Sequence, residues 1–391
     1  MKFDNTQKAY QLKTDRDLQK AYYLFLLFSN EKLVSIGSFV TRLILKMKLP
    51  VSYIFKITFF SQFCAGLNKK ESLKAVDSLK SYKILSYLHY AVEAVKTEKG
   101  MEISKNNTLE TLSFSKENKA LPFSVFKATS LGPINLFEKK SAGISFTDSE
   151  RNEWERIQLR IDACCTAAKQ IGVKMLIDAE ESWIQPAIDE IAESLMEKYN
   201  KKTPVIYTTL QMYRKDRMIY MKNLYNKATK RGFKVGIKLV RGAYIEKENL
   251  KAYKLGKPSP ICESKELTDQ NFNNGIDYML SKLNIGSLFM GSHNEQSILR
   301  VTEWMSQNKI SKNHPHIWFS QLYGMADHIS FNLASSGYQV VKYVPYGPVN
   351  EVIPYLVRRA EENTSITGQT PRELSLIKKE LKRRRVRARV F

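Results

Sequence analysis

The sequence has few of the residues from which metal sites and disulfides are built. Only four of its 391 residues are cysteines and five are histidines. The cysteines (Cys64, Cys164, Cys165 and Cys262) form no CxxC pair and no metal-ligand spacing, so we expect inert thiols in a reducing compartment. No HxH or HExxH pair falls on a predicted strand or helix, because His314 and His316 flank Pro315 in a loop. We therefore expect no metal ion and no metal hydrolase.

Nucleotide-binding loops and long apolar runs are also missing. The chain has no GxGxxG and no GxxxxGK[ST] motif, so a nucleotide cofactor would not be held in a Rossmann or P-loop manner. The most apolar early stretch, Ala21 to Phe28, ends at Asn30-Glu31-Lys32, well short of the roughly 20 residues that a spanning helix needs. The first residues, MKFDN, include an acid and lead into no apolar core. We expect neither a secretory signal nor a transit peptide, and a cytoplasmic location.

Positive charge is in large excess. The chain has 62 Lys and Arg against 39 Asp and Glu, a formal net charge of +23. Such an excess favours contact with polyanions, either nucleic acid or an anionic membrane surface. The most concentrated basic run lies from Lys378 to Arg389. We expect it to be a solvated or disordered tail, ahead of any specific binding role.

From residue 84 onward, short apolar runs alternate with longer amphipathic ones, a pattern typical of repeated βα units. The predicted strands are Ile84–Val92, Phe123–Ala128, Lys174–Asp178, Val205–Thr209, Val235–Val240, Leu288–Gly291, Ile317–Ser320 and Gln339–Tyr343, with helices such as Glu150–Gln170 and Ile188–Tyr199 between them. Eight such strands close a (β/α)8 barrel. Upstream, Asp15–Leu27 and Ser72–Ser81 have helical spacing.

The sequence therefore predicts an α/β protein with three parts. An N-terminal helical region spans residues 1–83, a distorted (β/α)8 TIM-like barrel spans residues 84–370, and a basic C-terminal tail spans residues 371–391.

Polar side chains stand at the carboxyl ends of the predicted strands, where barrel active sites are built. They are Lys127, Asp178, Gln211, Arg241, His293, Gln321 and Tyr343. Taken singly, each has an ordinary structural explanation, such as a helix cap for Lys127 or rim packing for the tyrosines. Their common position favours a site.

A pair of adjacent arginines follows the last predicted strand. In a helix over residues 354–363, Tyr355, Arg359 and Glu362 would share one face, with Arg358 at its edge. Two guanidinium groups side by side are well shaped to hold one carboxylate. The alternative is a solvated basic helix.

The predicted cations at this end of the barrel need a counter-charge. Lys127, Arg358 and Arg359 would repel one another unless an anion, or carboxylates such as Asp178, Glu180 and Glu362, offset them. A small carboxylate substrate is therefore implied. Tyr244 and Tyr343 could wall off the apolar part of its ring, and Leu322 and Ala243 could shape the pocket.

Seven ordered segments resemble the proline dehydrogenase family, flavin-dependent barrel enzymes that oxidise L-proline. They are Phe126-Lys127-Ala128-Thr129, Ile177-Asp178-Ala179-Glu180, Gln211-Met212-Tyr213, Lys238-Leu239-Val240-Arg241-Gly242-Ala243-Tyr244, Ser292-His293-Asn294, Gln321-Leu322-Tyr323-Gly324-Met325, and the strand and arginine helix from Val340 to Asn363. The resemblance covers about two-thirds of the chain.

The resemblance implies a role for each of these residues. It places FAD against Gln211, Lys238, Val240, Gly242, Lys265, His293, Asn294 and Glu362, with Lys238 near the reactive N5. It implies that Lys127, Asp178, Tyr343, Arg358 and Arg359 carry catalysis, and that Lys127, Ala243, Tyr244, Leu322, Tyr343, Arg358 and Arg359 bind the substrate. It further implies hydride transfer from L-proline to FAD, giving 1-pyrroline-5-carboxylate, and a quinone as the electron acceptor.

The first strand departs from the family. His89 stands where relatives usually have Asp, and Ala94 where they have Gly, which puts the polar network at the barrel entrance in doubt. Two other functions remain open. One is a flavoenzyme for another cyclic imino acid such as hydroxyproline. The other is a non-catalytic basic barrel that binds membrane or nucleic acid. The family's quinone chemistry also implies peripheral membrane association through the basic surface.

Overall fold

The computed structural model describes residues 1–30, 32–35, 37, 59–90, 97–349, 351–357 and 369–387. Eight strands form one sheet in the order β1-β8-β7-β6-β5-β4-β3-β2. From β2 to β8 each strand lies beside its neighbour in the chain, and β8 pairs with β1 in parallel. This is the strand order of a (β/α)8 barrel. The predicted α/β TIM-like fold is confirmed.

The chain divides into two compact units. The first unit comprises Met1–Glu93, His293–Asn313 and Phe319–Phe391, and the second comprises Ala94–Ser292 and His314–Trp318. Both units contain strands of the sheet, and both contain residues that the sequence predicts for the site.

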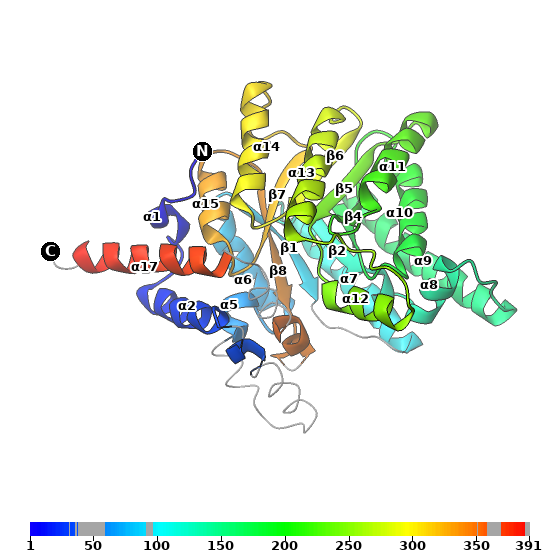
Figure 1. The fold of residues 1–391 in the computed structure, drawn as a ribbon, viewed down its shortest axis with the longest axis horizontal. Coiled ribbons are helices and arrows are strands. Elements are labelled where there is room, and N and C mark those ends of the chain that lie inside the picture. Colours follow the sequence, from blue (N-terminus) through cyan, green and yellow to red (C-terminus); the bar gives the residue numbers. More distant parts are fainter. Residues whose placement is uncertain are drawn as a thin grey trace. The chain divides into compact units, whose positions relative to one another are not determined.

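The second unit holds five strands and the helices that follow them (Figure 1). The strands are β2 (Phe123–Lys127), β3 (Lys174–Asp178), β4 (Ile206–Gln211), β5 (Val235–Val240) and β6 (Gly286–Gly291). The helices are α7 (Glu98–Glu117), α8 (Ile134–Ser141), α9 (Asp148–Ile171), α10 (Gln185–Tyr199), α11 (Arg217–Arg231), α12 (Ile245–Lys254) and α13 (Lys265–Ser281). The strands are almost wholly buried, which explains their near-continuous apolar sequences.

Local sequence sets the ends of these helices. Thr147 and Glu150 form a capping box that begins α9, and Gly172 ends it in the left-handed conformation, with φ +80°. The strand register then aligns the carboxyl ends. Lys127 pairs with Asp178 across β2 and β3, and Gln211 pairs with Val240 across β4 and β5.

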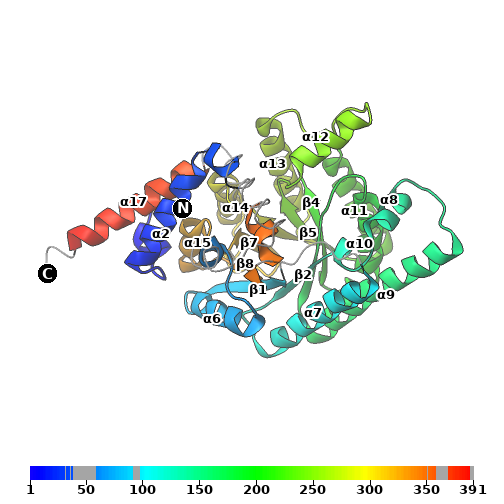
Figure 2. The ribbon, with the colours of Figure 1, turned by 90° about the horizontal axis from the view of Figure 1, so that it is seen from below.

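The first unit combines the remaining strands with both terminal regions. Its elements are α1 (Thr6–Ala9), α2 (Asp15–Phe28), α5 (Ser61–Phe63), α6 (Lys69–Lys80), β1 (Ile84–Tyr90), α14 (Glu295–Gln307), β7 (Ile317–Leu322, from Phe319 on), α15 (Asp327–Ser335), β8 (Val340–Tyr346) and α17 (Gln369–Arg387). The amino-terminal helix α2 and the carboxyl-terminal helix α17 lie side by side in both views (Figures 1 and 2).

The disorder expected as one possibility for the basic run Lys378–Arg389 is not observed up to residue 387, although Lys378, Lys382 and Arg385 are solvent-exposed. Residues 369–387 form α17, in which Leu376 and Ile377 are buried and Glu380 is fully buried. Glu380 pairs with Arg383 and Arg384 at 2.7 and 2.8 Å, so part of the positive charge is neutralised within the helix. An apolar stripe, hidden in sequence by the surrounding lysines and arginines, gives this helix its packing face.

Within the described part of the chain, no helix combines the length and apolarity that a membrane crossing requires. Over the same residues, no group of three or more His, Cys, Asp or Glu side chains is arranged to hold a metal ion.

Candidate active site

At the carboxyl ends of β2 and β3, Lys127 lies close to a buried carboxylate. Glu180, only 4% exposed, accepts the backbone N–H of Thr129 at 3.0 Å and also the Thr129 hydroxyl. Burial raises the pKa of Glu180, while the nearby charge of Lys127 and the Thr129 hydrogen bonds act in the opposite direction. Glu180 is thus fixed below Lys127 and largely occupied by Thr129.

Asp178 and Lys238 form an ion pair in the same unit. Lys238 Nζ lies 2.7 Å from Asp178 Oδ1, and the two side chains are 10% and 14% exposed. Lys127 on β2 is the register partner of Asp178, and the Asp178 carboxylate pairs with the Lys238 ammonium of β5. With the buried Glu180 near Lys127, two cations and two carboxylates form a charged row at these strand ends.

Gln211 joins three strand ends through its side-chain amide. Its Nε2 donates to the backbone oxygen of Glu180 at 2.8 Å, and its Oε1 accepts the backbone N–H of Ala243 at 3.0 Å. Gln211 is 3% exposed, so both hydrogen bonds are shielded from water. The amide therefore fixes the position of the exposed Ala243 in the loop after β5.

Gly242 is required at its position for a packing reason. Its φ is +145°, and an added Cβ would collide with the ring of Tyr213. Val240, two residues earlier, ends β5, and its carbonyl accepts the N–H of Met212 at 2.8 Å. Tyr244 follows as the half-buried residue that begins α12, with Lys247 Nζ 5.3 Å from its ring centre.

Lys265, at the first turn of α13, shares a carboxylate with Arg241. Lys265 Nζ and Arg241 Nε lie 2.7 and 2.6 Å from the two oxygens of Asp269. Burial opposes ionisation of Asp269, but hydrogen bonds from Lys265 and Arg241 outweigh it and lower its pKa. Arg241 also stacks on Phe272 at 4.3 Å and donates to Ser292 at 2.9 Å. The sequence marks Arg241 as a strand-end residue but assigns it no role.

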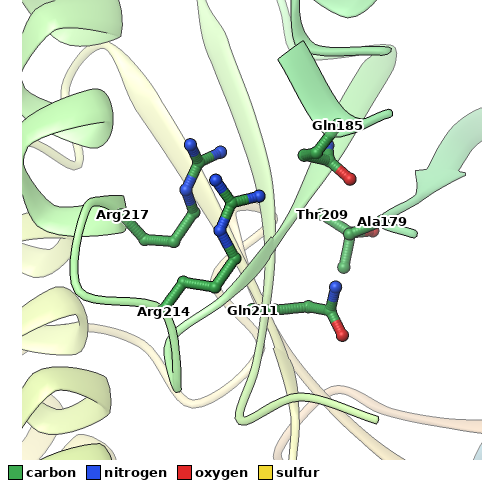
Figure 3. A pocket seen from close by; sticks show the side chains of 6 residues that line it. All are labelled: Ala179, Gln185, Thr209, Gln211, Arg214 and Arg217. Atoms are coloured by element: carbon green, nitrogen blue, oxygen red, sulfur yellow. The ribbon is translucent and has the colours of Figure 1, made fainter. Parts of the chain in front are cut away.

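A narrow, partly open recess adjoins Gln211 (Figure 3). It is lined by Ala179, Gln185, Thr209, Gln211, Arg214 and Arg217. Arg217 pairs with the buried Asp189 at 2.7 Å, and Arg214 pairs with Asp216 at the same distance. These ion pairs are internal to the second unit and hold two of the side chains that line the recess.

In the first unit, Tyr343 is held by a histidine and by other aromatic rings. Its hydroxyl lies 2.6 Å from Nδ1 of His89. Its ring packs against Tyr87 at 5.2 Å and Tyr355 at 6.2 Å between centroids. The residue that departs from the family, His89, is thus the hydrogen-bond partner of a predicted substrate-binding tyrosine.

Leu322 and His293 are directly connected. The backbone N–H of Leu322 donates to Nε2 of His293 at 3.0 Å, so a neutral His293 carries its proton on Nδ1. The next residue, Asn294, caps α14 by accepting the N–H of Ser297 at 2.9 Å. The predicted pocket-lining loop and the predicted cofactor residues of this unit are therefore coupled.

Lys342 was not among the residues predicted from the sequence. This lysine lies within the apolar strand β8 and is completely buried. Its Nζ lies 2.9 Å from Asp327 Oδ1 and donates to the backbone oxygens of Leu322 and Met325 at 3.1 and 2.5 Å. Lys342 thus holds the loop that carries Leu322, and a lysine among valines was the available signal.

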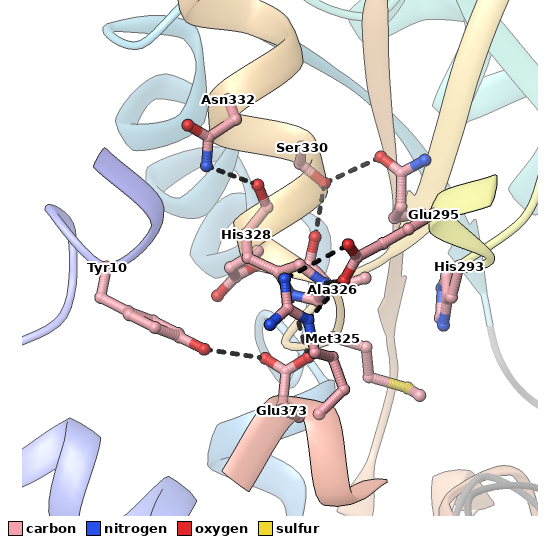
Figure 4. A network of polar contacts seen from close by, with 12 residues as sticks. Tyr10, His293, Glu295, Met325, Ala326, His328, Ser330, Asn332 and Glu373 are labelled. Atoms are coloured by element: carbon pink, nitrogen blue, oxygen red, sulfur yellow. Dashed lines mark hydrogen bonds and ion pairs between the residues drawn. The ribbon is translucent and has the colours of Figure 1, made fainter. Parts of the chain in front are cut away.

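A second missed cluster surrounds His328 on α15 (Figure 4). His328 lies 3.1 Å from Glu295 on α14 and 3.3 Å from Glu373 on α17. Burial alone would lower its pKa, but the two carboxylates raise it to about 9. Arg372 binds Glu295 at 2.8 Å, and Tyr10 donates to Glu373 at 3.4 Å.

The structure brings the predicted residues together in two groups, one in each unit. Lys127, Asp178, Gln211, Lys238, Val240, Gly242, Ala243, Tyr244 and Lys265 belong to the second unit, and His293, Asn294, Leu322 and Tyr343 belong to the first. Arg358, Arg359, Glu362 and Ala94 lie outside the described residues.

Solved structures support the fold. Proline utilization A from Bdellovibrio bacteriovorus, inactivated by N-propargylglycine, superposes with a TM-score of 0.70 at 22% identity, covering 80% of this chain and 33% of that one. Proline utilization A from Corynebacterium freiburgense gives a TM-score of 0.66 at 22% identity, covering 92% and 35%. The chain thus spans about a third of the length of these solved chains.

Sequence comparison supplies the family. A carbapenem antibiotics biosynthesis protein, CarD, from Pectobacterium carotovorum is 34% identical over 320 residues, covering 81% of this chain and 83% of the relative. Mitochondrial proline dehydrogenase 1 from Dictyostelium discoideum is 33% identical, covering 87% and 67%. Hydroxyproline dehydrogenase from Xenopus laevis is 29% identical, covering 96% and 89%. The family model for proline dehydrogenase matches residues 72–372, and the chain belongs to this family of oxidoreductases.

Proposed function

We propose that this protein oxidises L-proline to 1-pyrroline-5-carboxylate, with FAD as hydride acceptor and a quinone as final electron acceptor. The observation that carries the proposal is the charged row at the strand ends. Lys127 and Lys238 flank Asp178, and Lys238 pairs with it at 2.7 Å. An ammonium at a strand end can bind a carboxylate, and family membership favours a cyclic amino acid as the molecule that carries it.

In this proposal Lys127 holds the substrate carboxylate together with Arg358 and Arg359. Glu180, held by two hydrogen bonds from Thr129, would place a fixed negative charge near the Lys127 ammonium. Tyr343, Tyr244, Leu322 and Ala243 would line the rest of the pocket. Tyr343 is fixed by His89, Leu322 by His293 and Lys342, and Ala243 by Gln211. The lining is therefore pre-organised by hydrogen bonds that need no substrate.

Two of the donors that the resemblance assigns to FAD, Lys238 and Lys265, fit an anionic dinucleotide. Lys238 supplies positive charge near the end of β5, where Arg241 adds to it, and Lys265 supplies it at the first turn of α13, a helix end suited to phosphate. Lys265 and Arg241 are held in place by Asp269. FAD, when bound, accepts two electrons as a hydride. Lys238 would stabilise the negative charge that this acceptance creates.

The protein's part in the reaction is mainly positioning. The substrate amine must be neutral, because its lone pair forms the C=N bond as the hydride leaves the neighbouring ring carbon. Lys127 and the arginine pair would hold the carboxylate so that this carbon is presented in one orientation, and the aromatic lining would exclude water. Asp178 would keep Lys238 aligned, as their ion pair indicates.

The test is anaerobic reduction of the purified protein by candidate substrates. The protein should be yellow, with flavin absorption bands at about 370 and 450 nm. L-proline should bleach the longer-wavelength band. A colourless protein that cannot be reconstituted with FAD, or a yellow protein that L-proline does not bleach, would contradict the proposal.

A second candidate substrate is hydroxyproline, because a relative that covers 96% of this chain is named hydroxyproline dehydrogenase. The same bleaching assay with hydroxyproline separates the two. A faster reduction by proline supports the first assignment, and a faster reduction by hydroxyproline replaces it.

A quinone dissolved in a membrane would explain the excess positive charge, because a basic protein is attracted to anionic lipid. We propose that the protein works in the cytoplasm, at the inner face of a membrane, where a bilayer-dissolved quinone collects the electrons. The net charge of +23 supports attraction to anionic lipid. Turnover with a quinone embedded in anionic vesicles should exceed turnover with the same quinone in neutral vesicles, and equal rates would contradict this part of the proposal.

A further inference from the structure

Helix α2 is apolar on two opposite faces in its carboxyl-terminal half. One face is buried and includes Leu24, Phe25 and Phe28. On the other, Tyr23 and Leu27 are 65% and 48% exposed, and Leu26 is 46% exposed. A helix on the surface of a globular protein normally turns a polar face outward. The exposed face of α2 therefore has apolar side chains that the described residues of the unit leave accessible.

The amino-terminal half of the same face is basic. At about 100° per residue, Arg16 and Lys20 fall on the same side of the helix as Tyr23 and Leu27, within an arc of roughly 120° that also includes Leu26. Arg16 and Lys20 are exposed, and no Asp or Glu of α2 falls on this arc. Cations beside exposed leucines and a tyrosine are the pattern of a helix that lies in a membrane interface.

Helix α17, which packs against α2, adds a second basic stripe (Figures 1 and 2). Lys378, Lys382 and Arg385 are exposed and follow one another at helical spacing. Arg384 binds Asp15 at the start of α2 at 2.8 Å, which ties the two helices together. The exposed cations of α17 thus belong to the same helical pair as the apolar face of α2.

We propose that the outward face of α2, defined by Arg16, Lys20, Tyr23, Leu26 and Leu27, docks on an anionic lipid bilayer, assisted by the basic stripe of α17. The proposal rests on the proposed function, which delivers electrons to a quinone in a membrane. Charge complementarity selects an anionic surface. The exposed leucines select lipid over nucleic acid, because phosphate backbones are bound by cations and polar groups and make no use of aliphatic side chains.

Co-sedimentation with vesicles tests the surface directly. The full chain is mixed with vesicles of phosphatidylcholine alone, or of equal parts phosphatidylcholine and phosphatidylglycerol. The test variant is Leu26→Ser/Leu27→Ser. The matched control is Leu159→Ser/Ile219→Ser, which changes two apolar residues of the second unit that are 68% and 66% exposed.

The wild-type chain should bind the anionic vesicles and not the neutral ones. The α2 variant should bind them about tenfold or more weakly, since two leucine side chains no longer enter the interface. The control should bind like the wild type. No binding by the wild type, or equal binding by the α2 variant, overturns the proposal.

Three further measurements test the basic stripe, self-association and DNA binding. Lys378→Gln/Lys382→Gln should weaken binding severalfold and reduce its dependence on salt. If the α2 variant instead changes the oligomeric state in gel filtration and leaves vesicle binding intact, the face joins two copies of the chain and the proposal fails. The same failure follows if wild-type binding to duplex DNA is stronger than to vesicles and depends on the α2 leucines.

Proline-dependent bleaching of the flavin, measured without lipid, separates this surface from the enzymatic proposal. Vesicle binding without bleaching would leave the docking surface standing and remove the proposed activity. Bleaching without vesicle binding would do the opposite.

Discussion

The two compact units use buried ion pairs in different ways. In the second unit, Lys238 and Asp178 pair at the strand ends and keep 10% and 14% exposure. In the first unit, Lys342 and Asp327 pair with 1% and 11% exposure, and His328, at 5%, lies between two carboxylates. The Lys238–Asp178 pair remains partly accessible, whereas Lys342 and His328 are enclosed, as is the Arg217–Asp189 pair of the second unit, which lies away from the strand-end site with 6% exposure on each side.

This difference separates an ion pair that can take part in ligand binding from ion pairs that stabilise the fold. A partly exposed pair can exchange one partner for a ligand at modest cost, because water still screens the charges. An enclosed pair cannot lose a partner without leaving an uncompensated buried charge. We therefore expect a change at Lys127, near the Lys238–Asp178 pair of the second unit, to act mainly on turnover, and changes at the Lys342 and His328 pairs of the first unit to act on stability. A change at His89, which contacts Tyr343 in the first unit, should act on KM.

The largest effect is expected for Lys342→Met. The methionine approximates the length of the lysine stem but leaves Asp327 buried without its main partner, at a cost of about 3–5 kcal/mol of unfolding free energy. Chemical denaturation followed by circular dichroism measures this loss. The double variant Lys342→Met/Asp327→Leu should recover most of it, because no lone charge then remains. A single variant as stable as wild type would show that the pair is not enclosed in solution.

The next largest effect is a fall in unfolding free energy with rising pH, caused by His328, which contacts Glu373 on α17. His328 has its pKa raised from 6.5 to about 9, so its contribution is fully present below pH 6.5 and is lost as the pH rises through about 9. The shift corresponds to roughly 3 kcal/mol. Unfolding free energy should therefore fall over this range. His328→Gln should be less stable at pH 6 and lack this fall, and an unchanged pH profile in the variant would contradict the assignment.

A smaller effect, mainly on turnover, is expected for Lys127→Met. Loss of one charged hydrogen bond to the substrate should lower kcat/KM by about 1.5–3 kcal/mol, which is roughly 10- to 150-fold. Unfolding free energy should fall less than in Lys342→Met, because the buried Glu180 loses the nearby charge of Lys127 but keeps its two hydrogen bonds from Thr129. Lys201→Met, at an exposed position of the same unit, is the matched control. A variant that loses stability and not turnover would reverse the division between the units.

The smallest effect is expected for His89→Phe. The substitution keeps a ring beside Tyr343 and removes the hydrogen bond to its hydroxyl, at about 0.5–1.5 kcal/mol. KM should rise severalfold with kcat nearly unchanged, since the tyrosine lines the pocket and does not react. His89→Asn, which restores a polar partner, should recover part of the KM. A large loss of kcat would give His89 a more direct role.

The sequence predicted the positions of the strands to within one to three residues, because polar residues follow apolar strands in this fold. Lys174–Asp178 and Val235–Val240 were predicted with the observed bounds. The other strands differed by one to three residues at an end, as for Val205–Thr209, which is observed as Ile206–Gln211. Apolar periodicity marks the interior of a strand, but backbone pairing decides where it stops.

Ion pairs between residues that are distant in the chain could not be predicted from the sequence. Nothing local to Lys342 indicates Asp327, fifteen residues earlier, and nothing local to His328 indicates Glu373 on α17. The composition of α17 even pointed the wrong way, because its many cations suggested disorder. The ion pairs of Glu380 with Arg383 and Arg384, and the burial of Leu376, are what order this helix.

The most direct test of the account is the concentration dependence of flavin reduction by L-proline, measured anaerobically by rapid mixing. We predict that the wild-type flavin is reduced in a saturable manner. In Lys127→Met the half-saturating proline concentration should rise at least tenfold while the oxidised flavin spectrum stays the same. Identical curves for the wild type and Lys127→Met would contradict the claim that the charged row of the second unit holds the substrate.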